Sequence, residues 1–131
     1  NEMVERVDAN ALTADPADEA EGYVDTGFFL VALSDRDLVV GCGALQEVEP
    51  GVGQIRRMWV DPVLRGTGIG RRLLSALEGA AAVAGFEIIR LEAYEGLTEA
   101  ILLYETSGYM RTESESNAPA DLRFYEKRLM I

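Results

Sequence analysis

Apolar residues fall into short runs separated by polar turns, a spacing typical of a chain with several strands. Residues 28–33 and 38–45 are nearly continuous apolar runs, and the polar turn between them predicts a hairpin of two buried strands. After a Glu-Pro-Gly turn, residues 54–60 form a third predicted strand. Strict alternation would place three of its side chains together on one face: Ile55, Arg57 and Trp59.

Two later segments have the spacing of amphipathic helices. Residues 69–84 repeat apolar side chains at helical intervals, and Gly85 stands where a C-terminal cap is expected. Residues 98–107 predict a shorter helix with Thr98 as its N-cap. Between the two helices, residues 86–93 have the pattern of another strand.

The ends of the chain are less regular. Residues 109–112 and 122–129 predict two last strands with a polar loop between them. Residues 1–25 are acidic and weakly patterned, with a short helix expected over residues 13–23. The order of strands and helices therefore predicts a mixed α/β fold with one βαβ crossover around residues 54–93.

Composition excludes several chemistries. The 131 residues form one expected domain, and they contain no histidine, which rules out His-based triads and His-ligated zinc sites. Cys42 is the one cysteine, so no disulfide can form within the chain, and a thiol without imidazole is a poor nucleophile. With no apolar run of about 18 residues and no export signal, a cytoplasmic protein without a transmembrane helix is expected.

Charge is strongly acidic overall but unevenly placed. The net charge of −11 argues against nucleic acid or an anionic membrane as the main partner. Residues 51–90, in contrast, carry 3 acidic and 6 basic side chains. This middle segment is the part of the chain most attractive to an anion, unless its arginines simply cluster on a solvated face.

Three alternating glycines stand between the third strand and the first strong helix. A loop of this kind lets a ligand approach the backbone closely, and the free amides and dipole of the helix start favour a phosphate. The loop lacks the Gly-Lys-Ser/Thr ending of a Walker sequence and the spacing of a dinucleotide fingerprint. Taken alone, it is also compatible with a tight structural turn.

The surrounding residues resemble a known family. The run Met58-Trp59-Val60-Asp61-Pro62-x-x-Arg65-Gly66-x-Gly68-Ile69-Gly70-Arg71-x-Leu73-Leu74 is similar to the acyl-coenzyme A motif of the GNAT superfamily of N-acetyltransferases. Arg65, Gly68 and Gly70 match its Arg/Gln-x-x-Gly-x-Gly/Ala core, and residues 100–109 resemble the C-terminal helix motif. The resemblance covers about residues 28–129, with segments similar to those of many bacterial members.

This resemblance implies a mostly antiparallel central sheet flanked by helices, with acetyl-coenzyme A as cosubstrate and no metal. The pyrophosphate would sit on the glycine-loop amides, and the pantetheine arm would run along the preceding strand like an added strand. Trp59 is on that strand, and we expect it to pack in the core rather than face the acceptor. The implied cofactor-binding residues are Met58, Trp59, Val60, Arg65, Gly66, Thr67, Gly68, Ile69, Gly70 and Arg71.

The resemblance also implies catalytic roles. Tyr104 matches the tyrosine that protonates the leaving thiolate, the alternative being a tyrosine that only packs the helix. A backbone amide near Met58 would stabilise the oxyanion. Gln54 replaces the acid that many members use as a base, so Glu92 is the candidate base, with Glu47 or Glu49 as substitutes. Each of these glutamates could instead belong to a solvated face.

The expected function is transfer of an acetyl group from acetyl-coenzyme A to a primary amine of a small molecule. The alternatives are a non-catalytic acyl-coenzyme A binding domain and an acetyltransferase of a protein or peptide amine. Dimers are frequent among similar proteins, so a homodimer is one assembly that the resemblance allows. The family's first strand and helix are poorly represented in residues 1–25, and a truncated or divergent start is expected.

Overall fold

The computed structural model describes residues 4–9 and 27–129. The helix expected over residues 13–23 lies outside this part of the chain. Within it, seven strands form one sheet: β1 Val4–Ala9, β2 Gly27–Ser34, β3 Val39–Glu49, β4 Val52–Val60, β5 Ile88–Tyr94, β6 Met110–Thr112 and β7 Leu122–Arg128. A short 3-10 helix, η1 (Pro62–Leu64), follows β4, and the two α-helices are α2 (Ile69–Val83) and α3 (Thr98–Thr106).

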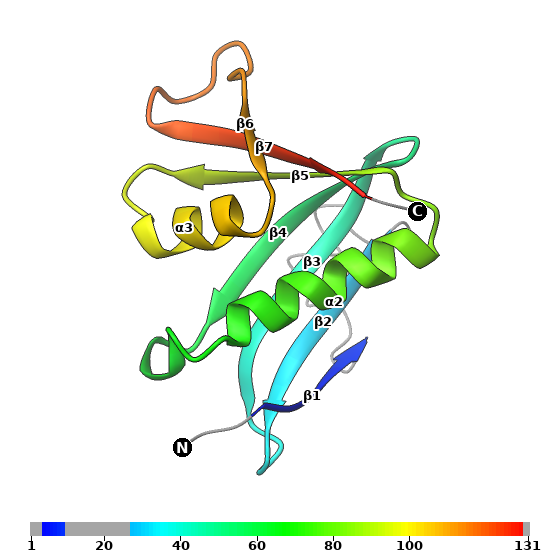
Figure 1. Cartoon of the computed structure of the whole chain (residues 1–131), viewed down its shortest axis with the longest axis vertical. Helices are drawn as coiled ribbons and strands as arrows, with labels where there is room; N and C mark the ends of the chain where they lie inside the picture. Colours follow the sequence, from blue (N-terminus) through cyan, green and yellow to red (C-terminus); the bar gives the residue numbers. More distant parts are fainter. Residues whose placement is uncertain (1–3, 10–26, 130–131) are drawn as a thin grey trace.

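The sheet is antiparallel except at its centre. Its strand order is β1-β2-β3-β4-β5-β7-β6, and β4 with β5 is the parallel pair among these strands (Figure 1). The chain makes this crossover through α2, because parallel neighbours cannot be joined by a tight turn. The predicted mixed, mostly antiparallel fold with one βαβ unit is therefore confirmed.

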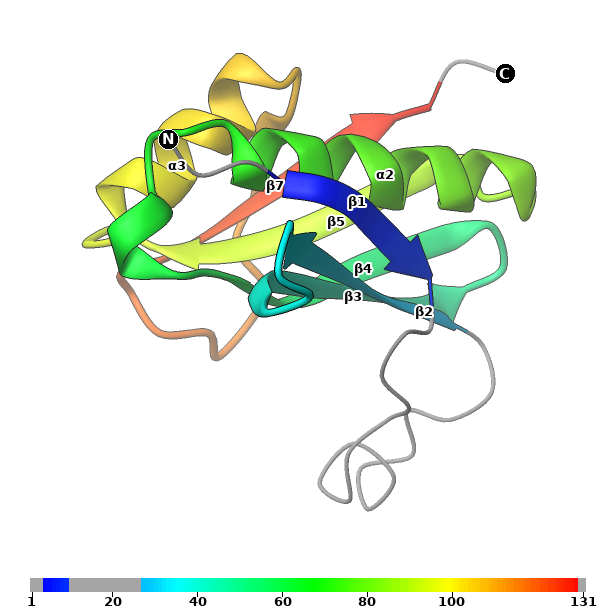
Figure 2. The ribbon, with the colours of Figure 1, turned by 90° about the horizontal axis from the view of Figure 1, so that it is seen from below.

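Both α-helices lie on the same face of the sheet (Figure 2). The apolar stripe of α2 is fully buried there against β2, β3 and β4. Gly41 and Gly43 permit this close packing: a Cβ atom at Gly41 would lie 2.9 Å from Leu73 Cδ1, and one at Gly43 would lie 3.0 Å from Leu77 Cδ1. Any larger residue at these two positions would push α2 away from the sheet.

The helix ends differ from each other. At the end of α2, Gly85 has a φ of 93° and Phe86 N–H donates to Ala81 O at 2.9 Å, so the predicted glycine cap is confirmed. The predicted Thr98 N-cap of α3 is wrong. The N-cap is Leu97, which makes no side-chain hydrogen bond to the helix. A backbone turn, in which Leu97 N–H donates to Tyr94 O, leads the chain directly into α3.

The strict alternation expected along β4 is also wrong. Cys42 of β3 pairs with Trp59, but Ala44 pairs with Arg56, so β4 contains one extra residue at this point. Arg57 takes up the extra residue with a φ of 59°, the geometry of a β-bulge.

The bulge reverses the facing of the residues that follow it. Met58 then turns toward α2, where its sulfur would meet a Cβ at Gly43, and Trp59 turns to the opposite face. Trp59 is 42% exposed, so the expectation that it packs in the core is wrong. Cys42 is half-buried on the same face as Trp59.

Candidate functional site

The site begins where β4 and β5 separate. The two strands pair only over Val52–Gln54 and Ile88–Arg90, and beyond this they diverge (Figure 1). On its other side β4 stays paired with β3, since Asp61 N–H donates to Val40 O at 2.8 Å. By strand alternation, Met58 and Val60 therefore direct their backbone groups toward the opening. No described strand covers this part of the β4 edge.

The glycine loop follows immediately. Asp61 Oδ1 accepts a hydrogen bond from Val63 N–H at 3.0 Å and so starts η1 directly after β4. Gly66 and Gly68 then adopt φ values of 84° and 93°, in the left-handed region that favours glycine. These two residues turn the chain into α2 within four residues of η1.

The first turn of α2 presents unpaired amides. Gly68 is the N-cap and supplies no side chain, and Arg72 N–H, which donates to Gly68 O at 3.0 Å, makes the first helical hydrogen bond. Among the described residues, no acceptor is found for the N–H groups of residues 68–71. Open space lies around Gly66 and Gly68 where side chains would otherwise stand. The arrangement of free amides, helix dipole and open space fits a phosphate or pyrophosphate.

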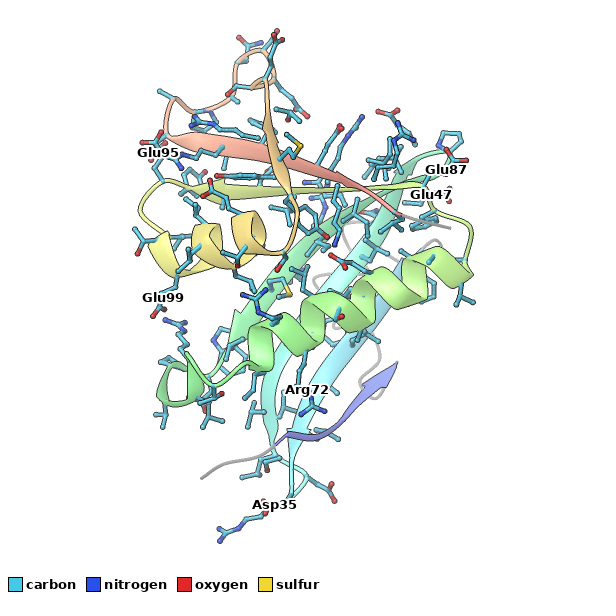
Figure 3. The ribbon with its side chains drawn as sticks, viewed as in Figure 1. Asp35, Glu47, Arg72, Glu87, Glu95 and Glu99 are labelled. Atoms are coloured by element: carbon cyan, nitrogen blue, oxygen red, sulfur yellow. The ribbon has the colours of Figure 1, made fainter. Side chains whose placement is uncertain are left out.

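The arginines of the loop have different surroundings. Arg65 Nε donates to Val60 O at 3.2 Å, which holds its guanidinium beside the end of β4. Arg72 points to the side of α2 that faces β1 (Figure 3). These positive charges flank the helix start on two sides, and they contribute to the local excess of basic residues in an acidic chain.

Arg71 joins α2 to α3. Its guanidinium donates from Nη2 to Thr106 Oγ1 at 2.9 Å and from Nη1 to Ser107 Oγ at 3.1 Å. Gly70 packs so closely on α3 that a Cβ atom there would lie 3.2 Å from Leu103 Cδ2. No local pattern predicts the roles of Thr106 and Ser107, because they lie 35 and 36 residues from Arg71 along the chain.

Tyr104 belongs to a cluster of three buried tyrosines on the helix side of the sheet. Its ring centroid lies 6.2 Å from that of Tyr109 and 6.5 Å from that of Tyr125. Tyr109 OH donates to Glu78 Oε2 at 2.8 Å, and Tyr125 OH donates to Glu105 Oε2 at 2.9 Å. In the described part of the chain, the Tyr104 hydroxyl has no such partner.

The environment of Tyr104 keeps its phenol protonated. Burial raises the pKa of Tyr104 above its ordinary value, because the phenolate would lose its hydration. The helix that carries Tyr104 lies across the opening between β4 and β5 (Figure 1). Tyr104 is thus a neutral phenol whose hydroxyl makes no structural hydrogen bond within the described residues.

The candidate base, Glu92, lies on the opposite face of the sheet. Leu91 and Ala93 face the helices, so Glu92 between them faces away, and its side chain is exposed. Glu92 lies two residues beyond Arg90, the last residue of β5 that pairs with β4. No described side chain hydrogen-bonds to it. It therefore stands at the start of the opening with its carboxylate available.

The two substitute bases are placed differently. Glu47 Oε2 accepts from Gly51 N–H at 3.2 Å and stabilises the β3–β4 turn. Glu49 forms an ion pair with Arg90 at 3.0 Å, and Arg90 Nε also donates to Glu126. Figure 3 shows Glu47 at the end of the sheet where β4 and β5 are still paired. Both substitutes thus have structural partners at the closed end.

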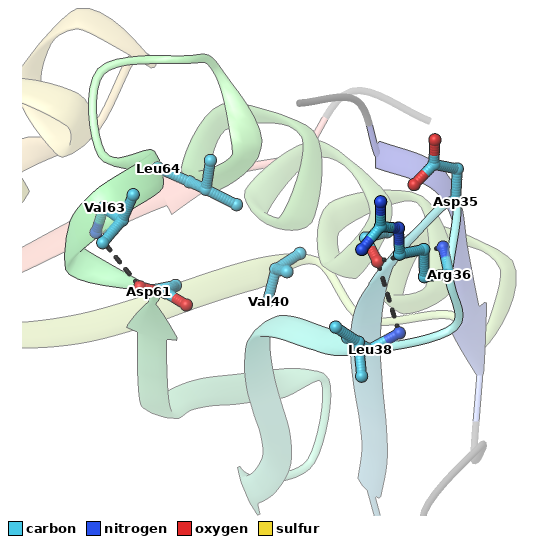
Figure 4. A pocket seen from close by; sticks show the side chains of 8 residues that line it. Asp35, Arg36, Leu38, Val40, Asp61, Val63 and Leu64 are labelled. Carbon is cyan, nitrogen blue, oxygen red and sulfur yellow. Dashed lines mark hydrogen bonds between the residues drawn. The ribbon is translucent and has the colours of Figure 1, made fainter. Parts of the chain in front are cut away.

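A separate hollow lies away from these residues. A shallow pocket of about 370 Å³ is formed by the β2–β3 turn and residues 61–64 (Figure 4). Ser34 Oγ organises this turn by accepting from Arg36 N–H and Leu38 N–H. None of the candidate catalytic residues lines the pocket, so we assign it no part in the chemistry. In the described residues, no cluster of acidic and sulfur side chains could hold a metal ion, and no helix is long and apolar enough to cross a membrane.

Comparison with known sequences identifies relatives. The chain is 43% identical over 82 residues to an IAA acetyltransferase of Azospirillum brasilense, a match that covers 62% of this chain and 53% of the relative. It is 33% identical over 97 residues to a mycothiol acetyltransferase of Sanguibacter keddieii, with 70% and 31% of the two chains covered. The chain thus spans about half or less of the length of these curated relatives.

Solved structures of acetyltransferases have the same fold as this chain. A putative acyl-CoA N-acyltransferase from Klebsiella pneumoniae is 32% identical, with 87% of this chain and 85% of that chain covered and a TM-score of 0.75. An acetyltransferase from Bacillus subtilis, solved with coenzyme A, has the same fold with a TM-score of 0.78, 16% identity and coverage of 95% and 99%. Residues 4–109 match the Acetyltransferase (GNAT) family. The resemblance in the sequence is confirmed, and the chain belongs to the GNAT family of acetyltransferases.

Proposed function

We propose that this chain transfers the acetyl group of acetyl-coenzyme A to a primary amine of a small molecule. The observation that carries the proposal is the juxtaposition of two features. The unpaired amides at the start of α2 lie at the mouth of the opening between β4 and β5, and the helix with the uncommitted Tyr104 hydroxyl lies across that opening.

The donor would bind through backbone groups. The pyrophosphate of acetyl-coenzyme A would accept hydrogen bonds from the amides of residues 68–71, with Arg65 adding positive charge. The pantetheine arm would lie along the free edge of β4 and pair with backbone near Met58 and Val60. Trp59 lies between these two residues but points to the other face of the sheet.

The transfer itself needs three groups. The nitrogen of the amine attacks the thioester carbonyl carbon, a C–N bond forms and the C–S bond breaks. A backbone N–H near Met58 supports the negative charge on the carbonyl oxygen. The nitrogen loses one proton to Glu92, directly or through water, and the sulfur gains one proton from Tyr104. The products are an acetamide and free coenzyme A.

The choice of an amine acceptor rests on charge, and the choice of a small one rests on the relatives. The net charge of −11 disfavours nucleic acids and favours cations, and an amine is a cation until it loses its proton. An amine on a basic protein or peptide satisfies the same electrostatic condition. The relatives named for IAA and mycothiol indicate small-molecule acceptors within the family.

A second candidate function is a non-catalytic acyl-coenzyme A binding domain. Gln54, the last residue of β4 that pairs with β5, stands where many family members have an acid. Glu47 and Glu49 do not replace that acid, because both have structural partners at the closed end of the sheet. Of the three candidate bases, Glu92 is then the one without a structural partner among the described residues.

The test is an acetyl-transfer assay. The purified chain is mixed with acetyl-coenzyme A and a panel that includes small amines, polyamines and a lysine peptide. Thiol release and the mass of the acetylated product are both measured. Amine-dependent thiol release with a small acceptor is the expected result. Binding of acetyl-coenzyme A without thiol release on any amine would favour the binding domain, and acetylation of the peptide alone would change the acceptor class.

A further inference from the structure

Two aromatic side chains are exposed on the helix-free face of the sheet. Trp59 of β4 is 42% exposed and Tyr94 of β5 is 47% exposed. Trp59 shares its face with its cross-strand partner Cys42, whose neighbours in β3 pack against α2. Tyr94 follows Ala93, which is buried on the helix side. Both rings therefore project from the same face, opposite to α2 and α3.

The two rings belong to the two strands that border the opening. Trp59 lies five residues beyond Gln54, and Tyr94 lies four residues beyond Arg90, the last residues that pair β4 with β5. Glu92 is on the same face of β5, between Arg90 and Tyr94. Leu97 is 54% exposed, and its N–H donates a hydrogen bond to Tyr94 O. This contact keeps Leu97 near Tyr94, where it adds a further exposed apolar side chain on the β5 side of the opening.

This combination suits one kind of ligand. Covering two exposed aromatic rings with a ligand removes their apolar surface from water, which is favourable. A protonated amine close to an aromatic face also gains a cation–π attraction. The Glu92 carboxylate adds a negative charge beside the rings. Arg56 is on the same face of β4, but it is already engaged in an interaction within the chain, so we assign it no contact with the acceptor.

We infer that the acceptor is an arylalkylamine, whose aromatic body lies between Trp59 and Tyr94 and whose amine lies at Glu92. This inference rests on the proposed acetyl transfer, because it names the acceptor class of the same site. Trp59 and Tyr94 would set the specificity for an aromatic body, and the chemistry at the thioester would stay that of the proposed reaction.

The chain carries its own reporter for this site, since Trp59 is its single tryptophan. Phenethylamine is titrated against the protein while Trp59 fluorescence is excited at a wavelength that phenethylamine does not absorb. Butylamine, with the same charge and no ring, is the matched probe. Both titrations are made with and without saturating coenzyme A. A saturable change with phenethylamine, about tenfold tighter than with butylamine, is expected in at least one condition.

Variants separate recognition from structure. Tyr94→Ala should lower the affinity for phenethylamine about tenfold and leave the affinity for coenzyme A unchanged. Tyr94→Phe should keep most of the affinity for phenethylamine. Val83→Ala, the control, removes an exposed apolar residue at the far end of α2. It should change neither the affinity for phenethylamine nor the affinity for coenzyme A. Absence of a saturable signal, equal affinity for the two amines, or wild-type behaviour of Tyr94→Ala would overturn the inference. Failure of coenzyme A to bind would instead count against the proposed function, because the amine titration is read separately.

Discussion

At the scale of single residues, the three buried tyrosines divide by the partner of their hydroxyl. Tyr109 and Tyr125 donate to carboxylates, and Tyr104 has no acceptor in the described part of the chain. We predict that Tyr104→Phe lowers kcat about a hundredfold, the size expected for loss of a proton donor, with little change in acetyl-coenzyme A affinity or stability. Steady-state kinetics and urea unfolding measure both quantities.

The control for this variant is Tyr109→Phe, which removes a hydroxyl from the same cluster. It should cost about 2 kcal/mol of unfolding free energy, because Glu78 loses a hydrogen bond in a half-buried site, and it should leave kcat within about threefold of wild type. Equal losses of kcat in the two variants would show that Tyr104 acts only through packing.

Stability at alkaline pH follows from the same tyrosines. Burial, and for Tyr109 also the hydrogen bond to Glu78, raises the pKa of Tyr104 and Tyr109 in the folded state. The folded protein therefore holds these protons more tightly than the unfolded chain. Stability is fully present below about pH 10 and is lost above it, at up to about 1.4 kcal/mol per pH unit for each tyrosine.

Urea unfolding measured from about pH 8 to about pH 11 tests this dependence. Tyr109→Phe should start from a lower stability and lose it less steeply above about pH 10. A Tyr109→Phe variant as steep as wild type would mean that the unfolded chain protects this phenol equally well.

At the scale of elements, apolar periodicity was enough to locate most helices and strands. The segments 28–33, 69–84 and 86–93 correspond to β2, α2 and β5 within a few residues. The β4 bulge was not predictable, because a left-handed arginine at position 57 has no local signature and is set by pairing with β3. That one residue decides which side of the sheet Met58 and Trp59 face.

The contact between α2 and α3 provides the element-scale prediction. If Arg71 holds α3 in place, a double-mutant cycle of Arg71→Ala and Thr106→Val should show a coupling of about 0.5–1 kcal/mol in unfolding free energy, since the contact is exposed. Arg71→Ala should then lower kcat by a larger factor than it lowers the affinity for acetyl-coenzyme A, because α3 carries Tyr104.

The opposite pattern would point to a different role for Arg71. A coupling near zero, with a large rise in KM for acetyl-coenzyme A and an unchanged kcat, would mean that its guanidinium leaves α3 and binds the donor phosphates directly. Thr106→Val alone serves as the control, because it removes the partner without changing the charge at the helix start.

At the scale of the whole molecule, sequence motifs located the glycine loop and α3, but not their three-dimensional relation. The free amides, the opening of the sheet and Tyr104 come together through the parallel pairing of β4 with β5 over only three residues of each strand. The roles of Glu47 and Glu49 were equally hidden, because their partners Gly51 and Arg90 are fixed by the turn and by the neighbouring strand. Side-chain partnerships of this kind depend on tertiary structure, not on local pattern.

The central claim is that the amides at the start of α2 bind acetyl-coenzyme A, and calorimetric titration tests it most directly. Gly68→Glu places a carboxylate on these amides and should abolish binding. Gly79→Glu makes the same charge change about 17 Å along the exposed side of α2, with open space around it, and should bind as wild type does. Wild-type binding lost only in Gly68→Glu is the predicted result. A folded Gly68→Glu variant that binds as tightly as wild type, or a folded wild-type chain that does not bind, would contradict it.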